Sequence, residues 1–216
     1  MNKEKMHVRL IDNLAGIQFK MSEEALALLE SCLHEEARKW EKRINDLPDE
    51  KQAEFAKYYS DDFHDVSKEF PDLLRKSFLL ASYSIFEHNL KLLCKAYDKA
   101  KELNGFDFSA KHNIITLKSH LMKNPEFCSA TDSESWQHFE NVINKIRNSI
   151  AHKNGYIEDN TINRTAREYI STSESLSLDH HDNIEITSDD FIIESIHCYK
   201  SIIDDLLLRW KNSITT

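Results

Sequence analysis

Apolar residues recur every three or four positions over long stretches of this chain, and short polar breaks separate the stretches. Such spacing puts apolar side chains on one face of an α-helix. It predicts a first helix that begins at Ser22 and ends near Pro48, with one apolar stripe made of Leu26, Leu29, Leu33, Ala37, Trp40 and Ile44. A shorter helix is predicted over residues 49–59, and the polar run 60–65 is predicted to be a loop.

Further helices are expected along the rest of the chain. The longest begins at Pro71 and continues to Gly105; it is apolar on more than one side, which is typical of a central helix. A short helix is expected at 114–122, another at 133–155 with Gly155 as its stop, and a last one after Ser188. Before Ser188, apolar and polar residues alternate, which predicts a small β-hairpin that contains Leu176, Leu178, Ile184 and Ile186.

Composition supports a helical fold. Only three glycines and three prolines occur in 216 residues, whereas loop-rich and all-β proteins use both residues more often. The expected fold class is therefore all-α, a helical bundle with a β-hairpin insertion at about 174–187.

The net charge of −9 at pH 7 argues against a protein that coats nucleic acid, because such proteins neutralise phosphates with lysine and arginine. A small basic pocket is still compatible with it. The cysteines are too far apart for a paired motif, namely Cys32, Cys94, Cys128 and Cys198. Free thiols, together with the lack of an apolar run of signal-peptide or membrane-spanning length, predict a cytoplasmic protein without membrane contact.

Two clusters of polar residues are candidates for chemistry. In the first, Asp-His-His-Asp at 179–182, neighbouring strand residues point to opposite faces and hairpin tips are normally polar. We therefore interpret this run as a solvated turn and not as a metal site. The chain also lacks a paired-histidine metal motif and a phosphate-binding glycine loop, so we expect neither a metal nor a cofactor.

The second cluster is Arg-Asn-Ser-Ile-Ala-His at 147–152, near the end of an expected helix. Asn148 and His152 are four residues apart and therefore neighbours. Arg147 and His152 are five apart, or about 140° around an ideal helix, so they share a face only if the last turn is distorted or a second subunit completes the site. The helix dipole explains cations such as Arg147, His152 and Lys153 at this end, but it does not explain Asn148.

This run resembles the signature of the HEPN superfamily of small α-helical domains, an arginine often followed by a polar residue and then a histidine after four to six residues. Phe86-Glu87, in the long expected helix, is similar to a stretch of the second core helix in several HEPN families. The resemblance covers about 70–212. It implies a HEPN-like domain of four core helices at 70–216, preceded by a helical extension at 1–69.

The resemblance also implies an activity, metal-independent cleavage of RNA by the ribose 2′-hydroxyl. His152 would transfer the proton and Arg147 would stabilise the phosphate, whereas Asn148 would either orient the histidine or donate to a phosphate oxygen. In HEPN proteins two motifs usually meet in a homodimer. The implied setting is a toxin or phage-defence (abortive infection) system, with an antitoxin or another defence protein as partner. Cations near the motif are the expected RNA contacts, namely Lys145, Arg164 and Arg167, and Lys153 and Glu87 are expected to support the site.

Other interpretations remain open on the sequence. Glu87 either holds Arg147 or pairs with Lys91 on the surface. The whole domain is either a ribonuclease or a catalytically silent HEPN-like module that binds a partner protein or a nucleotide; a plain helical scaffold is a third alternative. Tyr83, Phe86 and Trp136 fall on apolar stripes, so we expect them in the core and not as stacking platforms for bases.

Overall fold

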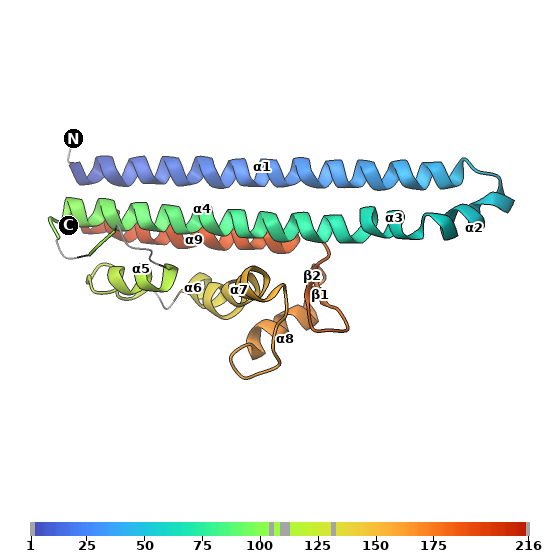
Figure 1. The fold of residues 1–216 in the computed structure, drawn as a ribbon. Coiled ribbons are helices and arrows are strands. Elements are labelled where there is room, and N and C mark those ends of the chain that lie inside the picture. The colour runs from blue at the N-terminus through green and yellow to red at the C-terminus, as the bar shows by residue number, and fades with distance from the viewer. Residues whose placement is uncertain (1–2, 104–105, 109–112, 131–132, 215–216) are drawn as a thin grey trace.

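Three long helices lie side by side in the computed structural model, which describes residues 3–103, 106–108, 113–130 and 133–214 (Figure 1). They are α1 (Lys3–Asn45), α4 (Phe70–Ala100) and α9 (Asp190–Ser213). Between α1 and α4 the chain reverses through α2 (Asp49–Tyr58), α3 (Ser60–His64) and the π-helical turn η1 (Asp65–Glu69). Helix α4 therefore runs antiparallel to α1.

A second layer covers the side of α4 and α9 that faces away from α1 (Figure 1). It contains α5 (Ile114–Leu121) and one continuous helix made of α6 (Glu134–His138), the π turn η3 (Phe139–Ile143) and α7 (Asn144–Lys153). Helix α8 (Arg164–Thr172) and the strands β1 (Leu176–Leu178) and β2 (Ile184–Ile186) follow. The strands pair antiparallel, with Leu176 opposite Ile186. The expected all-α fold with a small hairpin is confirmed.

Two expectations for the first 69 residues are wrong. The first helix begins at Lys3 and not at Ser22, because the Ser22 hydroxyl donates to the Gln18 carbonyl within the helix (2.9 Å) and does not cap a helix start. The run 60–65 is helical and not a loop, since it forms part of the reversal between α1 and α4. Helix α8 was not expected from the sequence; its apolar side is short, with only Ala166 and Ile170 buried.

An aromatic cluster forms the centre of the core. The rings of Phe86 on α4 and Tyr199 on α9 are stacked, with centroids 4.7 Å apart and planes 6° apart. Phe139 and Trp136 pack against this pair from the α6–η3–α7 helix. The expectation that Tyr83, Phe86 and Trp136 lie in the core is confirmed, because all three are buried.

Helix α1 shares this core. Val8, Ile11, Phe19 and Leu26 belong to the same cluster of buried apolar residues as the side chains of α4 and α9. The last buried residue of α1 is Glu30, so the remainder of the helix extends beyond the bundle with α2 and α3 (Figure 1). The division of the chain at residue 69 stays a prediction, but the core is continuous across it.

A buried ion pair joins α1, α4 and the hairpin. Arg75 Nε donates to Glu30 Oε1 (2.7 Å) and Arg75 Nη2 to Glu30 Oε2 (2.6 Å). The same guanidinium donates through Nη1 to the carbonyls of Ile186 (3.3 Å) and Thr187 (2.8 Å). Hydrogen bonding to Glu30 raises the pKa of Arg75 above its ordinary value. One cation thus holds two long helices and the end of β2 together.

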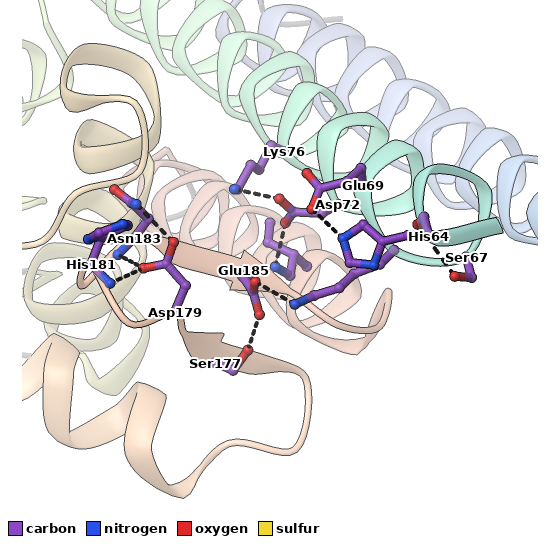
Figure 2. A network of polar contacts seen from close by, with 12 residues as sticks. His64, Ser67, Glu69, Asp72, Lys76, Ser177, Asp179, His181, Asn183 and Glu185 are labelled. Carbon is purple, nitrogen blue, oxygen red and sulfur yellow. Dashed lines mark hydrogen bonds and ion pairs between the residues drawn. The ribbon is translucent and has the colours of Figure 1, made fainter. Parts of the chain in front are cut away.

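Neighbouring polar contacts attach the hairpin to the start of α4 (Figure 2). Asp72 Oδ1 accepts a hydrogen bond from the Ile186 amide (2.7 Å). Lys68 Nζ lies 2.9 Å from Glu185 Oε1, whose other carboxylate oxygen accepts from the Ser177 hydroxyl (3.0 Å). The hairpin is therefore held by side chains from η1 and α4 as well as by its own strand pairing.

Replacing Arg75 alone should lower the free energy of unfolding more than replacing both Arg75 and Glu30. Arg75→Met leaves the Glu30 carboxylate buried and unpaired, so we expect the free energy of unfolding to fall by about 3 kcal/mol. The double variant Glu30→Leu, Arg75→Met should recover a large part of this loss. Urea denaturation measures both. Lys39→Met, which removes an exposed pair with Glu36, is the control and should leave the free energy of unfolding almost unchanged, because water and salt screen exposed ion pairs. Equal losses in the single and double variants would contradict the role of the pair.

Candidate functional site

The helix that carries the Arg-Asn-Ser-Ile-Ala-His run contains a π turn, η3 (Phe139–Ile143), immediately before α7. A π turn holds more residues than an α turn, so the helix beyond it is rotated relative to an uninterrupted α-helix. An uninterrupted helix would leave Arg147 beside the apolar stripe. In the structure Asn144 and Arg147 instead contact Tyr83 on α4.

The end of α7 is anchored to the hairpin. Asn154 (φ 53°) and Gly155 (φ 88°) both have left-handed backbones, and the Gly155 amide donates to the Ser149 carbonyl (2.9 Å). The Gly155 carbonyl accepts from the amide of Ile184 in β2 (3.0 Å). The expectation that the helix stops at Gly155 is confirmed, since α7 ends at Lys153. A side chain at 155 would be strained by this φ.

A cleft of about 470 Å³ lies along α7. Arg147, Asn148 and His152 all line it, as do Tyr83 from α4 and Asn144 from the first turn of α7. Asn113 and Ile114 at the start of α5, and Asn163 just before α8, form other parts of its wall. Its volume is within the range of about 300–1,000 Å³ that is common for small-ligand sites.

Arg147 is held by uncharged groups. Its guanidinium carbon lies 4.1 Å from the centroid of the Tyr83 ring, and its Nη1 donates to Asn148 Oδ1 (2.9 Å). Asn144 Oδ1 accepts from the Tyr83 hydroxyl (3.2 Å) and from Asn148 Nδ2 (3.4 Å). Asn144 therefore connects the two groups that contact the Arg147 guanidinium. Within the described part of the chain, Arg147 Nε has no hydrogen-bond partner and no carboxylate pairs with the guanidinium. The positive charge is therefore available to an anion in the cleft.

His152 lies in the last turn of α7 and is exposed. It lines the same cleft as Arg147, although the two residues are about 140° apart on an ideal helix. One chain thus brings both side chains to one cleft, and a second subunit is not needed for that. Among the described residues, none forms a hydrogen bond with the His152 ring.

The cleft is basic in an acidic chain. Its described lining residues include Lys145, Arg147 and Lys153 but no aspartate or glutamate, whereas the whole chain carries a charge of −9. Lys153 also forms an ion pair outside the lining, with Glu158 (2.7 Å), and its hydrogen bond lowers the pKa of that carboxyl. Burial raises the pKa of the Tyr83 hydroxyl, and the nearby Arg147 partly opposes this. Amides and cations together suit a phosphate-bearing ligand.

Three of the expected site residues lie elsewhere. Arg164 is exposed and pairs with Glu168 (2.9 Å). Arg167 donates to the Ile157 carbonyl (2.6 Å) and to Asp182 Oδ1 (2.8 Å), so it fastens α8 to the hairpin. Glu87 is half-buried on α4, and within the described residues it forms an ion pair with neither Arg147 nor Lys91. None of the three lines the cleft.

Sequence reasoning missed Tyr83, Asn144, Asn113 and Asn163 as cleft residues. Tyr83 was expected in the core, which is correct, but its ring also faces the cleft. Asn144 left a weak signal: it precedes Asn148 by one helical turn, and asparagine is a poor helix former. For Asn113 and Asn163 there was no signal, because they come from separate segments that only the tertiary fold brings to α7.

The Asp-His-His-Asp run forms the hairpin tip, as expected. Asp179 Oδ1 accepts from the backbone amides of His181 (2.7 Å) and Asn183 (2.8 Å), and Asp179 Oδ2 accepts from the Asn183 amide group (2.9 Å). These hydrogen bonds lower the pKa of the Asp179 carboxyl to about 2, and the bond from the Asn183 side chain has the largest effect. The described residues contain no group of three histidine, cysteine or acidic side chains placed to hold a metal. Nor do they contain a helix that is long and apolar enough to cross a membrane.

The Tyr83 ring, more than its hydroxyl, should hold Arg147 in place. Tyr83→Phe keeps the ring under the guanidinium and loses one hydrogen bond to Asn144, so we expect a loss of at most about 1 kcal/mol in unfolding free energy. Tyr83→Leu removes the ring and should cost about 2 kcal/mol or more. Urea denaturation of both variants measures the difference. Equal losses would show that the hydroxyl is the important group.

Comparison with family models, with curated proteins and with solved structures finds no match for this chain. A function must therefore be argued from the cleft and from the residues that line it.

Proposed function

We propose that this protein is a metal-independent endoribonuclease of the HEPN type. One observation carries the proposal: Arg147, Asn148 and His152 line a single cleft that is basic within an acidic chain. The described lining contains cations and amides but no carboxylate, which suits an RNA backbone better than a cationic or apolar ligand.

The reaction assigns one task to each residue of the motif. His152 accepts the proton of a ribose 2′-hydroxyl while its oxygen attacks the adjacent phosphorus. A bond forms between the 2′-oxygen and phosphorus, and the bond to the 5′-oxygen of the next nucleotide breaks. The leaving 5′-oxygen takes a proton from water and becomes a 5′-hydroxyl, and the other product is a 2′,3′-cyclic phosphate. His152 returns its proton to the solvent, which restores the starting state. Arg147 neutralises the charge that develops on the phosphate oxygens.

Asn148 has a positioning role in this scheme. Its Oδ1 accepts from Arg147 Nη1 (2.9 Å), which directs the guanidinium along the cleft wall, and the Tyr83 ring supports it from beneath. Because Arg147 is already ordered by neutral groups, little reorganisation is needed when a phosphate arrives. Lys145 is a further cation at the cleft for the RNA backbone.

The biological setting follows from the HEPN resemblance alone. It is a toxin or phage-defence role in the cytoplasm, with an antitoxin or a defence-system protein as partner. The resemblance also implies a homodimer whose motifs meet. Since one chain already lines its cleft with Arg147 and His152, a second copy is not required to complete that pair.

His152→Ala should abolish cleavage. Without the imidazole there is no group in the motif to take the 2′-hydroxyl proton, so we expect the rate of RNA cleavage to fall by about 100-fold or more. Purified protein is incubated with tRNA and mixed RNA in EDTA, and the fragments are separated on a gel. A 2′,3′-cyclic phosphate terminus on the products identifies the chemistry.

The matched control is His34→Ala, which removes an exposed histidine from α1, a helix that contributes nothing to the described cleft lining. This variant should cleave at the wild-type rate. If wild type and His152→Ala give the same background fragments, the ribonuclease proposal fails.

A second candidate is a catalytically silent HEPN-like module that binds a nucleotide or a partner protein. One observation favours it: among the described residues none hydrogen-bonds to the His152 ring, so nothing orients it for proton transfer. Catalytic histidines are commonly oriented by such a partner. A protein that binds a nucleotide in this cleft without cleaving RNA would support this candidate over the enzyme.

Lys145 and Arg164 should differ in their effect on RNA binding. Lys145 lines the cleft, whereas Arg164 is exposed outside it and pairs with Glu168. In a His152→Ala background, Lys145→Ala should weaken binding of single-stranded RNA and reduce the slope of log affinity against log salt by about 0.7. Arg164→Ala should leave both unchanged. Fluorescence anisotropy at several salt concentrations measures these values. An equal loss in the Arg164 variant would locate RNA binding outside the cleft.

A further inference from the structure

The buried serines of the described chain hydrogen-bond within the protein, with one exception. Ser22, Ser82 and Ser195 donate to backbone carbonyls three or four residues earlier in their own helices, at 2.9, 2.9 and 2.8 Å. Ser175 shares a hydrogen bond with the Ser173 hydroxyl (3.0 Å). The exception is Ser149 on α7, which is only 6% exposed, although none of the described residues forms a hydrogen bond with its hydroxyl.

This hydroxyl does not serve the stability of the folded chain. Burial of a hydroxyl without a partner is unfavourable, and serine is a poorer helix former than alanine. Ser149 lines the cleft, and its oxygen is accessible there, unlike the enclosed and unpaired Nε1 atoms of Trp136 and Trp210. A buried polar group of this kind takes its partner from outside the chain, which in a cleft means water or a bound ligand.

The groups around Ser149 favour an anion as that ligand. Lys145 precedes Ser149 by four residues and His152 follows it by three, so both are its neighbours on the surface of α7. Helical side chains lean toward the N-terminus, which directs the His152 imidazole toward the turn that contains Ser149. All three residues line the cleft together with Arg147. Beside these cations, a ligand oxygen carries negative charge and accepts the hydrogen bond that the hydroxyl can donate.

We propose that the Ser149 hydroxyl donates a hydrogen bond to a non-bridging oxygen of the phosphate on which Arg147 and His152 act. The inference deepens the proposed ribonuclease function and rests on it for the identity of the ligand, an RNA phosphodiester. Ser149 contacts the phosphate directly but takes no part in proton transfer, which stays with His152. The cleft then holds one phosphate through the charge of Arg147 and through a neutral donor beside the imidazole.

The position of Ser149 suits such a contact. Its backbone carbonyl accepts hydrogen bonds from the amides of Asn154 and Gly155 at the end of α7. The donor is therefore attached to a fixed turn of helix, and little reorganisation is needed when a phosphate arrives. Negative charge on the non-bridging oxygens increases as the 2′-oxygen attacks, so the hydrogen bond from Ser149 strengthens in the transition state.

Affinity for RNA tests the contact. In a His152→Ala background, which lacks the proposed proton acceptor, Ser149→Ala should weaken binding of single-stranded RNA about tenfold, because a hydrogen bond to a charged oxygen is lost. The slope of log affinity against log salt should not change, since a neutral hydroxyl releases no counterion. An unchanged slope distinguishes Ser149 from Lys145. Fluorescence anisotropy at several salt concentrations measures both quantities.

Ser22→Ala is the matched control. Ser22 is also 6% exposed, but its hydroxyl is bonded to the Gln18 carbonyl, and α1 contributes nothing to the described cleft lining. This variant should bind RNA as the His152→Ala background does. Urea denaturation is a second readout: Ser149→Ala breaks no hydrogen bond within the described chain and improves helix propensity, so its free energy of unfolding should be unchanged or slightly higher.

Inorganic phosphate is a second probe, and it does not depend on ribonuclease activity. The ring signals of His152 in the NMR spectrum of the full chain are identified by their absence in His152→Ala. Phosphate should shift these signals in the wild type, and Ser149→Ala should weaken the apparent affinity for phosphate about tenfold. Ser22→Ala should titrate as the wild type does.

The outcomes separate the two proposals. If the wild type cleaves RNA and Ser149→Ala leaves the affinities for RNA and phosphate unchanged, the serine contact is overturned and the ribonuclease stands. If the wild type does not cleave RNA but its affinity for phosphate depends on Ser149, the ribonuclease is overturned and the contact stands. A Ser149→Ala variant that loses stability together with affinity assigns the hydroxyl a structural role, which overturns the contact. Phosphate that leaves the His152 signals unshifted overturns it as well.

Discussion

The stacked contact between Phe86 and Tyr199 determines where the candidate site lies. It fixes α4 against α9, and Phe139 packs on both rings from the π turn of the third helix. That turn is thereby held against α4. One turn before Phe86 along the same helix, Tyr83 lies at the edge of the cluster and presents its ring to Arg147. A cation is thus placed on the wall of the core by apolar packing and not by a carboxylate.

The two ends of the motif are positioned by different forces. Arg147 depends on the aromatic core, whereas the end of α7 depends on backbone hydrogen bonds between Gly155 and Ile184 of β2. The hairpin is held in turn by Arg75, which donates to backbone carbonyls at the end of β2 while it pairs with Glu30. A buried ion pair whose residues do not line the cleft therefore supports the turn in which His152 lies.

Net charge describes this protein poorly. The chain is acidic overall, yet the charged residues of the described cleft lining are all cations, namely Lys145, Arg147 and Lys153. This contrast arises because a helical bundle divides each helix into faces with separate surroundings.

Local patterns along the sequence determined the helical class, the hairpin, the burial of Phe86 and Trp136 and the stop at Gly155. Each of these depends on neighbours within a few residues, through periodicity or through the backbone freedom of glycine. Only the tertiary structure decided that Arg147 rests on Tyr83, that Arg167 is engaged by Asp182, and that a π turn rotates α7. Those outcomes depend on contacts between segments far apart in the chain, where packing and hydrogen-bond partners override the ideal geometry of one helix.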